Sequence, residues 1–206
     1  MNKEFFSGNR SRFLNAMEPR TLAAFFSDRE IRKSADANYL FYANRNFVYL
    51  TGIEQKESVL LMGKTEEGEV WERLYLLPKD LLAERWTGRR LTGEEAFAIS
   101  GVRDVRSAVS FREELEGLLK EYSGLYLDLH KQDPSDIDRP AHSLAKDLVD
   151  VTVLDGNSIV RHLRTIKQPC EIEALRKEYE AILKTIRRLG TLKCGTLRRL
   201  GQYCFV

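Results

Sequence analysis

Hydrophobic positions along the chain alternate between short strand-like runs and longer helix-like stretches. The compact apolar runs at 21–26 and 38–42 predict two buried strands. The runs at 57–62 and 72–77 flank the turn-rich segment 64–68, which is typical of a β-hairpin. The alternation is completed by an opening helix that ends at 13–17, by helices at 79–86, 93–100, 111–122 and 138–148, and by strands at 102–105, 124–129 and 151–153. The pattern predicts an α/β fold, a mixed sheet of about six strands flanked by helices.

The clearest predicted element is a long helix that follows Pro169. A proline is tolerated in the first turn of a helix, and Gly190 offers a C-terminal stop. Apolar residues recur there at spacings of three and four, so they line one side of a helix about 31 Å long. We call this set the seam, and it comprises Ile172, Leu175, Tyr179, Ile182, Ile186 and Leu189.

An apolar seam of this length requires a partner. Three partners are open at this stage: the first domain of the chain, a second copy, or a further domain that is absent. We favour the third, because residues 190–206 contain three glycines in seventeen positions, so this end is expected to be weakly ordered and cannot easily cover the seam.

Charge is nearly balanced overall, with 33 basic and 31 acidic residues, but it is unevenly distributed. From Ala181 to Val206 there are six basic residues and no acidic one, so this end differs from the rest of the chain. We therefore expect a domain at 1–155, a linker and the first helix of a further domain at 156–190, and a weakly ordered basic tail at 191–206.

Composition excludes several classes of protein. With 43% hydrophobic residues, the chain has enough apolar surface to fold, which excludes a disordered or low-complexity polymer. No apolar run approaches the roughly 18 residues that cross a bilayer, and the charged start lacks a secretory signal. The three cysteines match no C-x-x-C spacing, so we expect free thiols in a cytoplasmic protein.

Familiar catalytic and metal-binding motifs are incomplete. Residues 62–65 resemble the end of a phosphate-binding loop, but Ser58 stands where that loop needs glycine. The three histidines match no zinc-ligand spacing, and the aspartates at 133, 136 and 138 lack the glycine and glutamate of a calcium loop. We therefore expect no catalytic residue and no metal ligand.

The segment 85–90 is the most promising polar segment. Trp86 lies there among three arginines, whose guanidinium groups can hold carboxylates through paired hydrogen bonds. The segment could therefore present an aromatic face and anion-binding groups to a peptide or to another subunit. The alternative is that Trp86 packs on the sheet while the arginines are solvated or pair with Glu84, Glu94 and Glu95.

Four segments occur in a recognisable order. They are residues 33–53 (KSADANYLFYANRNFVYLTGI), 57–61 (ESVLL), 86–91 (WTGRRL) and 160–173 (VRHLRTIKQPCEIE). The first three resemble the N-terminal domain of Xaa-Pro aminopeptidases, the aminopeptidase P family. The fourth resembles the junction at which that family enters its C-terminal catalytic domain. The likeness covers about residues 4–180.

This resemblance implies a creatinase-like N-terminal domain ahead of a dinuclear metal hydrolase. In that family two metal ions, commonly manganese, activate a water that attacks the bond before a penultimate proline. Their ligands, two aspartates, a histidine and two glutamates, all lie in the C-terminal domain. None has a counterpart before Val206, so we expect a chain that is truncated before that domain, binds no manganese and is inactive alone.

The favoured interpretation is a non-catalytic domain that mediates oligomerisation and shapes the substrate cleft of an Xaa-Pro aminopeptidase. Trp86 and Arg89 are the candidates for contact with a substrate or a subunit. The alternative is a freestanding interaction module that acts through the seam at 172–189. Its partner would be a second copy or a full-length paralogue. We expect no membrane partner and no nucleic acid, although the basic tail leaves nucleic-acid binding as a weaker idea.

Overall fold

The computed structural model describes residues 1–129 and 139–190. These residues fall into two compact units, Met1–Thr165 and a second unit that begins at Ile166. The first unit contains the sheet, and the second contains one long helix, α8 (Pro169–Gly190). The predicted basic tail at 191–206 lies outside the described residues.

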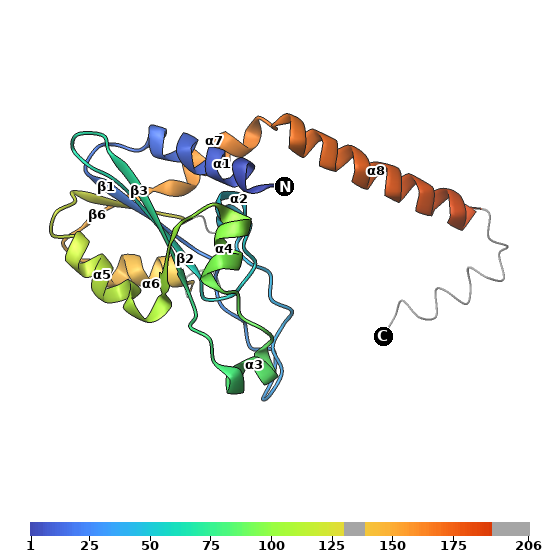
Figure 1. The fold of residues 1–206 in the computed structure, drawn as a ribbon, viewed down its shortest axis with the longest axis horizontal. Helices are drawn as coiled ribbons and strands as arrows, with labels where there is room; N and C mark the ends of the chain where they lie inside the picture. Colours follow the sequence, from blue (N-terminus) through green and yellow to red (C-terminus); the bar gives the residue numbers. More distant parts are fainter. Residues whose placement is uncertain (130–138, 191–206) are drawn as a thin grey trace. The chain divides into compact units, whose positions relative to one another are not determined.

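The first unit is built on one six-stranded sheet with the order β4-β3-β2-β1-β5-β6 (Figure 1). Strand β2 runs antiparallel to β1 and β3, and every other neighbouring pair is parallel. Five strands therefore point the same way, and their carboxyl ends gather at one edge of the sheet. The strands are β1 (Thr21–Phe26), β2 (Val59–Lys64), β3 (Val70–Leu76), β4 (Asp104–Ser107), β5 (Gly124–Leu127) and β6 (Thr152–Asp155).

Helices cover both faces of this sheet. One hydrophobic core holds side chains of α1, α2, α4 and α7, and the other holds side chains of α5 and α6. The third helix, α3, buries no residue. The helices are α1 (Lys3–Ala16), α2 (Arg45–Thr51), α3 (Leu81–Thr87), α4 (Gly93–Ser100), α5 (Phe111–Leu118), α6 (Pro140–Asp147) and α7 (Gly156–Thr165), with a 3₁₀ turn at Ala108–Ser110.

The central strand β1 is a nearly continuous apolar run because its side chains enter the cores on both faces of the sheet. Ala23 and Phe25 belong to the core under α1, whereas Leu22 and Ala24 belong to the core under α5. Successive side chains of a strand point to opposite faces, so a strand covered on both faces carries apolar side chains at successive positions, as at 22–25.

A buried arginine fixes α1 to the sheet. The guanidinium of Arg10 is fully buried and donates hydrogen bonds to the carbonyls of Leu50 and Ser100 at 2.8 and 2.9 Å. Its Nε donates to Oε2 of Glu72 on β3 at 2.6 Å. One side chain therefore links α1 to β3 and to the ends of α2 and α4.

The predicted fold class is confirmed: the sheet is mixed, has six strands and is flanked by helices, and a long C-terminal helix follows it. The predicted hairpin is present as β2 and β3, and the helix after Pro169 is present as α8. No helix within 1–129 or 139–190 is long and apolar enough to cross a membrane.

Some predicted elements were wrong. Residues 38–42 form no strand, because the segment has only one isolated bridge, between Arg32 and Asn38. The helix predicted at 111–122 ends as an α-helix at Leu118. Two helices were missed, namely α2 and α7, and α7 belongs to the first unit.

Candidate functional site

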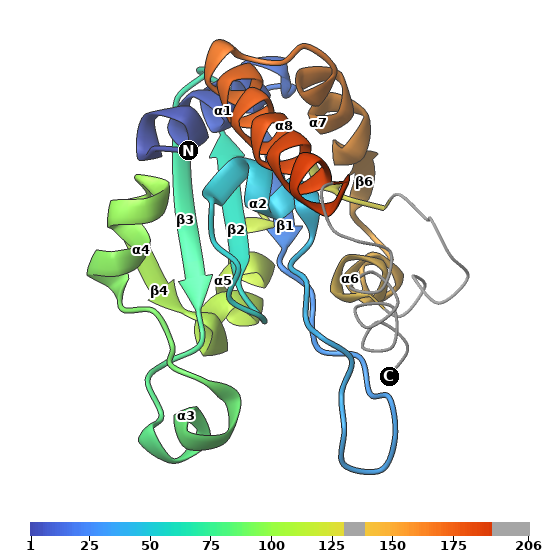
Figure 2. The same cartoon turned by 90° about the vertical axis from the view of Figure 1, so that its right-hand side faces the viewer.

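Two arms extend from the sheet edge at which the carboxyl ends of the parallel strands gather. The first arm, residues 28–43, follows β1, and the second arm, residues 77–92, follows β3 and carries α3. Both arms project from the same end of the sheet (Figure 2). Ligand sites of open α/β sheets lie at this edge, so the arms occupy the place where a site is expected.

Local interactions form the second arm. The side chain of Asp80 accepts hydrogen bonds from the backbone N–H groups of Leu82 and Ala83, both at 3.0 Å, and thereby caps α3. These backbone hydrogen bonds lower the pKa of Asp80, the one from Ala83 most strongly. The helix ends at Gly88, whose φ of 88° lies in the region that glycine adopts without strain. The arm is therefore shaped by its own cap and stop rather than by packing on the sheet.

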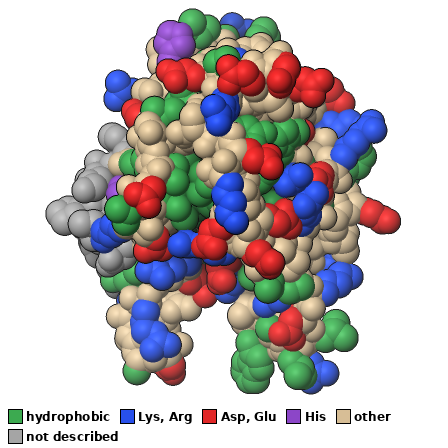
Figure 3. Space-filling view, turned by 90° about the vertical axis from the view of Figure 1, so that its left-hand side faces the viewer, with side chains coloured by type: hydrophobic (Ala, Val, Ile, Leu, Met, Phe, Trp, Pro, Cys, Tyr) green, Lys and Arg blue, Asp and Glu red, His purple; other side chains and the backbone are tan. Residues whose placement is uncertain are grey.

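The apolar residues of α3 face solvent. Trp86 is 91% exposed, and Leu81 and Leu82 are 78% and 72% exposed. Figure 3 shows hydrophobic side chains gathered on the lobe that this arm forms. The alternative in which Trp86 packs on the sheet is therefore wrong, and the tryptophan is available for contact.

The two arginines after α3 hold the base of the second arm. Arg89 pairs with Glu95, the residue that completes the capping box of α4 with Thr92. The hydrogen bond from the Thr92 backbone, and then that from Arg89, lowers the pKa of Glu95. Arg90 donates from Nη1 to the carbonyl of Pro78. Arg89 thus has the carboxylate partner foreseen by the alternative interpretation, and its contact with a substrate or subunit stays a prediction.

A hollow of about 500 Å³ lies at the base of the second arm. Its volume is within the range of small-ligand pockets. Gln55 lines it, and Oε1 of Gln55 accepts a hydrogen bond from the Leu91 N–H at 2.7 Å. Nε2 of Gln55 is buried and has no partner among the described residues. The apolar lining comes from Phe41, Ile53, Leu77, Leu91 and Ile99.

The described residues do not provide a metal centre. Within 1–129 and 139–190, no group of three or more histidine, cysteine, aspartate or glutamate side chains could hold an ion. His142 lies on α6, with Nε2 at 3.1 Å from the carbonyl oxygen of Leu129. His130 and the aspartates at 133, 136 and 138 lie outside the described residues. The residues present do not fit a dinuclear metal pair, so no hydrolytic step is assigned to them.

The seam forms a continuous apolar face along α8. Its six residues are between 40% and 66% exposed, with Leu189 lowest and Tyr179 highest. Leu183, which the sequence analysis missed, is 48% exposed. No other helix or strand is described in the second unit, so the seam has no partner within that unit's described residues.

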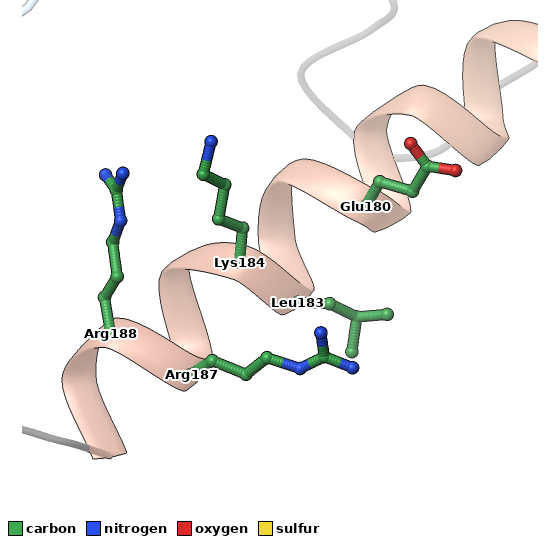
Figure 4. A pocket seen from close by; sticks show the side chains of 5 residues that line it. All are labelled: Glu180, Leu183, Lys184, Arg187 and Arg188. Carbon is green, nitrogen blue, oxygen red and sulfur yellow. The ribbon is translucent and has the colours of Figure 1, made fainter.

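A shallow depression lies near the C-terminal end of α8 (Figure 4). Lys184 and Arg188 extend to one side of the helix, and Leu183 and Arg187 extend to another. Every residue that lines it, including Glu180, belongs to this single helix. The depression is therefore part of a helix surface and not an enclosed site.

Comparison of the sequence with known proteins gives matches in one family. The family model for the aminopeptidase P N-terminal domain matches residues 6–126. The Xaa-Pro aminopeptidase of Haemophilus influenzae is 31% identical over 203 residues, which are 98% of this chain and 44% of that protein. The Xaa-Pro aminopeptidase of Escherichia coli is 28% identical over 190 residues, 87% of this chain and 42% of that protein. The chain thus spans less than half the length of these relatives.

Solved structures show the same fold. A Bacillus anthracis protein, provisionally assigned as an aminopeptidase P, has a TM-score of 0.79 and 30% identity over 84% of this chain and 42% of its own. Aminopeptidase P of Escherichia coli, solved with the inhibitor Pro-Leu, has a TM-score of 0.73 and 26% identity. That likeness covers 86% of this chain and 42% of the Escherichia coli chain.

Proposed function

Because the chain belongs to the family of aminopeptidase P N-terminal domains, we propose that it serves as the non-catalytic domain of an Xaa-Pro aminopeptidase. In this role it promotes oligomerisation and shapes the substrate cleft of a manganese-dependent enzyme that removes the residue before a penultimate proline. The substrates are peptides of that kind. The metal chemistry lies outside the described residues, which lack a fitting set of ligands.

The exposed position of Trp86 is the observation that carries this proposal. A tryptophan that is 91% exposed, beside two exposed leucines, contributes little to the folding stability of the domain. Tryptophan is, however, the residue type most enriched at the centres of protein interfaces. The second arm projects away from the end of the sheet, so its tip can contact a neighbouring molecule (Figure 2). We assign to Trp86 contact with a substrate or neighbouring subunit, and to Arg89 a place beside it.

A chimeric enzyme tests the role of the arm. The chimera joins this chain to the portion of the Haemophilus influenzae relative that it does not cover. We expect Trp86→Ala to lower kcat/KM for a proline-second peptide by about tenfold, because truncating an anchor tryptophan at an interface costs more than about 1 kcal/mol, and about 1.4 kcal/mol corresponds to a factor of ten. Val109→Ala is the matched control, since Val109 is 79% exposed and lies outside both arms. Equal kcat/KM values for Trp86→Ala and the parent chimera would refute the assignment.

The same proposal makes a negative prediction for the chain alone. Purified chain with added Mn²⁺ should release no first residue from a proline-second peptide, because the described residues hold no metal cluster. Metal-dependent turnover by the purified chain would overturn the proposal that the domain is non-catalytic.

The exposed seam favours a second candidate function, a protein-interaction module that acts through α8. Six large apolar side chains along one helix face are rarely left in water. The partner in this case is a second copy or a full-length paralogue. Loss of association in Leu175→Glu and Ile182→Glu, measured by sedimentation, is the expected result, and unchanged association would remove this candidate.

A further inference from the structure

We propose that Gln55 is a positioning residue of the second arm: it fixes the direction in which the arm leaves the sheet, and thereby where Trp86 lies. The consequence for activity rests on the proposed function, in which Trp86 contacts a substrate or a neighbouring subunit. The hold of Gln55 on the arm is a property of this chain alone, so it can be tested separately.

The second arm depends on contacts at its base, because α3 buries no residue. The backbone N–H of Leu91, on the stem that returns from α3 to α4, donates to Oε1 of Gln55 at 2.7 Å. Leu91 also packs its half-buried side chain against the core under α1. Apolar packing has no preferred direction, whereas a hydrogen bond does. The core therefore holds Leu91 in place, and Gln55 fixes how the stem is turned.

The other polar contacts at the base have different effects. Arg90 donates to the carbonyl of Pro78, and so ties the two stems on either side of α3 to each other. Arg89 pairs with Glu95 on α4, but the Arg89 side chain is 67% exposed, and exposed ion pairs are weak. The hydrogen bond to Gln55, by contrast, is partly buried and joins the arm to the connection between α2 and β2.

The connection that carries Gln55 is itself anchored on both sides. Ile53 is 1% exposed, and its N–H donates to Oγ1 of Thr51 at 3.1 Å. Ser58 is fully buried, and its hydroxyl donates to the carbonyl oxygen of Gln55 at 3.0 Å. The side chain of Gln55 therefore extends to the arm from a firm support.

The amide of Gln55 is only half satisfied. An N–H group needs an acceptor, so the oxygen of the amide and not its nitrogen faces Leu91. The nitrogen, Nε2, is buried and has no partner among the described residues. A buried donor without a partner offsets much of what one hydrogen bond contributes to stability. The side chain therefore adds little to folding stability, and its distinct effect is on the position of the arm.

Backbone ¹⁵N relaxation of α3 in the full chain tests the hold of Gln55 on the arm. Gln55→Met keeps the length of the side chain and removes both the acceptor and the unpaired donor. We expect the order parameters of α3 to fall from about 0.85 to below about 0.6, while the urea midpoint of the first unit changes little. Gln55→Glu keeps an acceptor facing Leu91 and should restore the wild-type order parameters.

Lys56→Met is the matched control. Lys56 is the next residue and lines the same hollow, but its ion pair is with Glu30 of the first arm, at 2.8 Å. We expect wild-type order parameters of α3 in this variant. Equal order parameters in the wild type and Gln55→Met overturn the inference, and so does an equal fall in Lys56→Met or Gln55→Glu. A large decrease in the urea midpoint of Gln55→Met also overturns it, because the residue would then act through stability.

The chimeric enzyme links the position of the arm to activity. Gln55→Met should lower kcat/KM for a proline-second peptide by at most the factor of about ten expected for Trp86→Ala. Gln55→Glu, which retains an acceptor, should keep the parent value. In the Trp86→Ala chimera, Gln55→Met should have no further effect, because Gln55 acts through the contact of Trp86.

The two proposals fail in different ways. If the losses in Gln55→Met and Trp86→Ala multiply, the positioning role is overturned and the proposed function stays in place. If Trp86→Ala causes no loss, the proposed function is refuted, and the order parameters of α3 still decide whether Gln55 holds the arm.

Discussion

Replacing Arg10 by methionine should destabilise the first unit by about 3 kcal/mol. The substitution keeps a similar volume, so the cost comes from the acceptors that the buried guanidinium leaves behind. The carbonyls of Leu50 and Ser100 each lose a buried hydrogen bond, at about 1 kcal/mol apiece. The loss of the charged partner of Glu72 adds about 1 kcal/mol. This is the lower end of the range of about 3–5 kcal/mol for a broken buried pair, because the Glu72 side chain is still 28% exposed and water compensates part of the loss.

Urea unfolding measures this free energy through the midpoint at constant m-value. Thermal unfolding should show a decrease in Tm of about 6–12 °C for a unit of this size. Arg112→Met is the matched control. Arg112 is 48% exposed, and its pairs with Glu116 and Asp147 lie on the surface of α5 and α6. Such pairs contribute about 0–1 kcal/mol, so the control should change the midpoint little.

The double variant Arg10→Met with Glu72→Met separates a lost pair from general disruption. Because it removes both charges, it should be more stable than the sum of the two single losses predicts. The reasoning is refuted if Arg10→Met is no more destabilising than Arg112→Met, or if the two single losses simply add.

Three further predictions concern local features of the first unit. Gly52→Ala should lower the free energy of unfolding by at least about 1 kcal/mol, because Gly52 has a φ of 71° and an added Cβ would overlap the ring of Phe6. An unchanged urea midpoint would contradict this. Gly117→Ala, in the last turn of α5 with nothing within 4 Å of the new Cβ, should instead raise stability by about 0.5 kcal/mol, and a decrease in the midpoint would refute it. The hydrogen bond from Arg106 lowers the pKa of Asp104 below its ordinary 3.8. A lowered pKa gives stability that is present above the unfolded value and is lost as pH falls through the folded value. Melting curves of the wild type should therefore lose more between pH 6 and pH 2 than those of Asp104→Asn, and equal losses would exclude this contribution.

The sequence predicted the centre of the sheet well because the side chains of β1, β2 and β5 are buried on both faces. Continuous apolar runs such as 21–26 leave little choice between strand and surface loop. The same rule failed at 38–42, where aromatic and apolar residues are as dense but Tyr39 and Leu40 are exposed. Strand propensity reports suitability for a pleated surface and not the presence of a neighbouring strand.

A local signal for the missed helix α2 was present in the sequence. Asn44 caps α2 by accepting hydrogen bonds from the N–H groups of Asn46 and Phe47. An asparagine immediately before an apolar periodic stretch is a helix-start signal, and it was hidden by the aromatic run that precedes it.

The candidate site could be predicted only in part. Residue types alone singled out Trp86, because a tryptophan beside three arginines can present an aromatic face and anion-binding groups. Its exposure depends on α3 burying none of its residues, which no local pattern specifies. The hydrogen bond from Leu91 to Gln55 joins residues 36 positions apart, so the hollow at the base of the second arm follows from tertiary structure.

Because the side chains of α3 and of the α8 seam are exposed, substitutions there can change contacts with other molecules without changing the folding stability of the chain. The helix α3 is held by the Asp80 cap and the turn at Gly88, and α8 is long enough to form several helical turns with its own ion pair. Neither Trp86 nor Leu175 is buried, and substitutions of exposed residues usually change stability by less than about 0.5 kcal/mol. Loss of activity in Trp86→Ala, or of association in Leu175→Glu, therefore measures a lost contact and not unfolding of the chain.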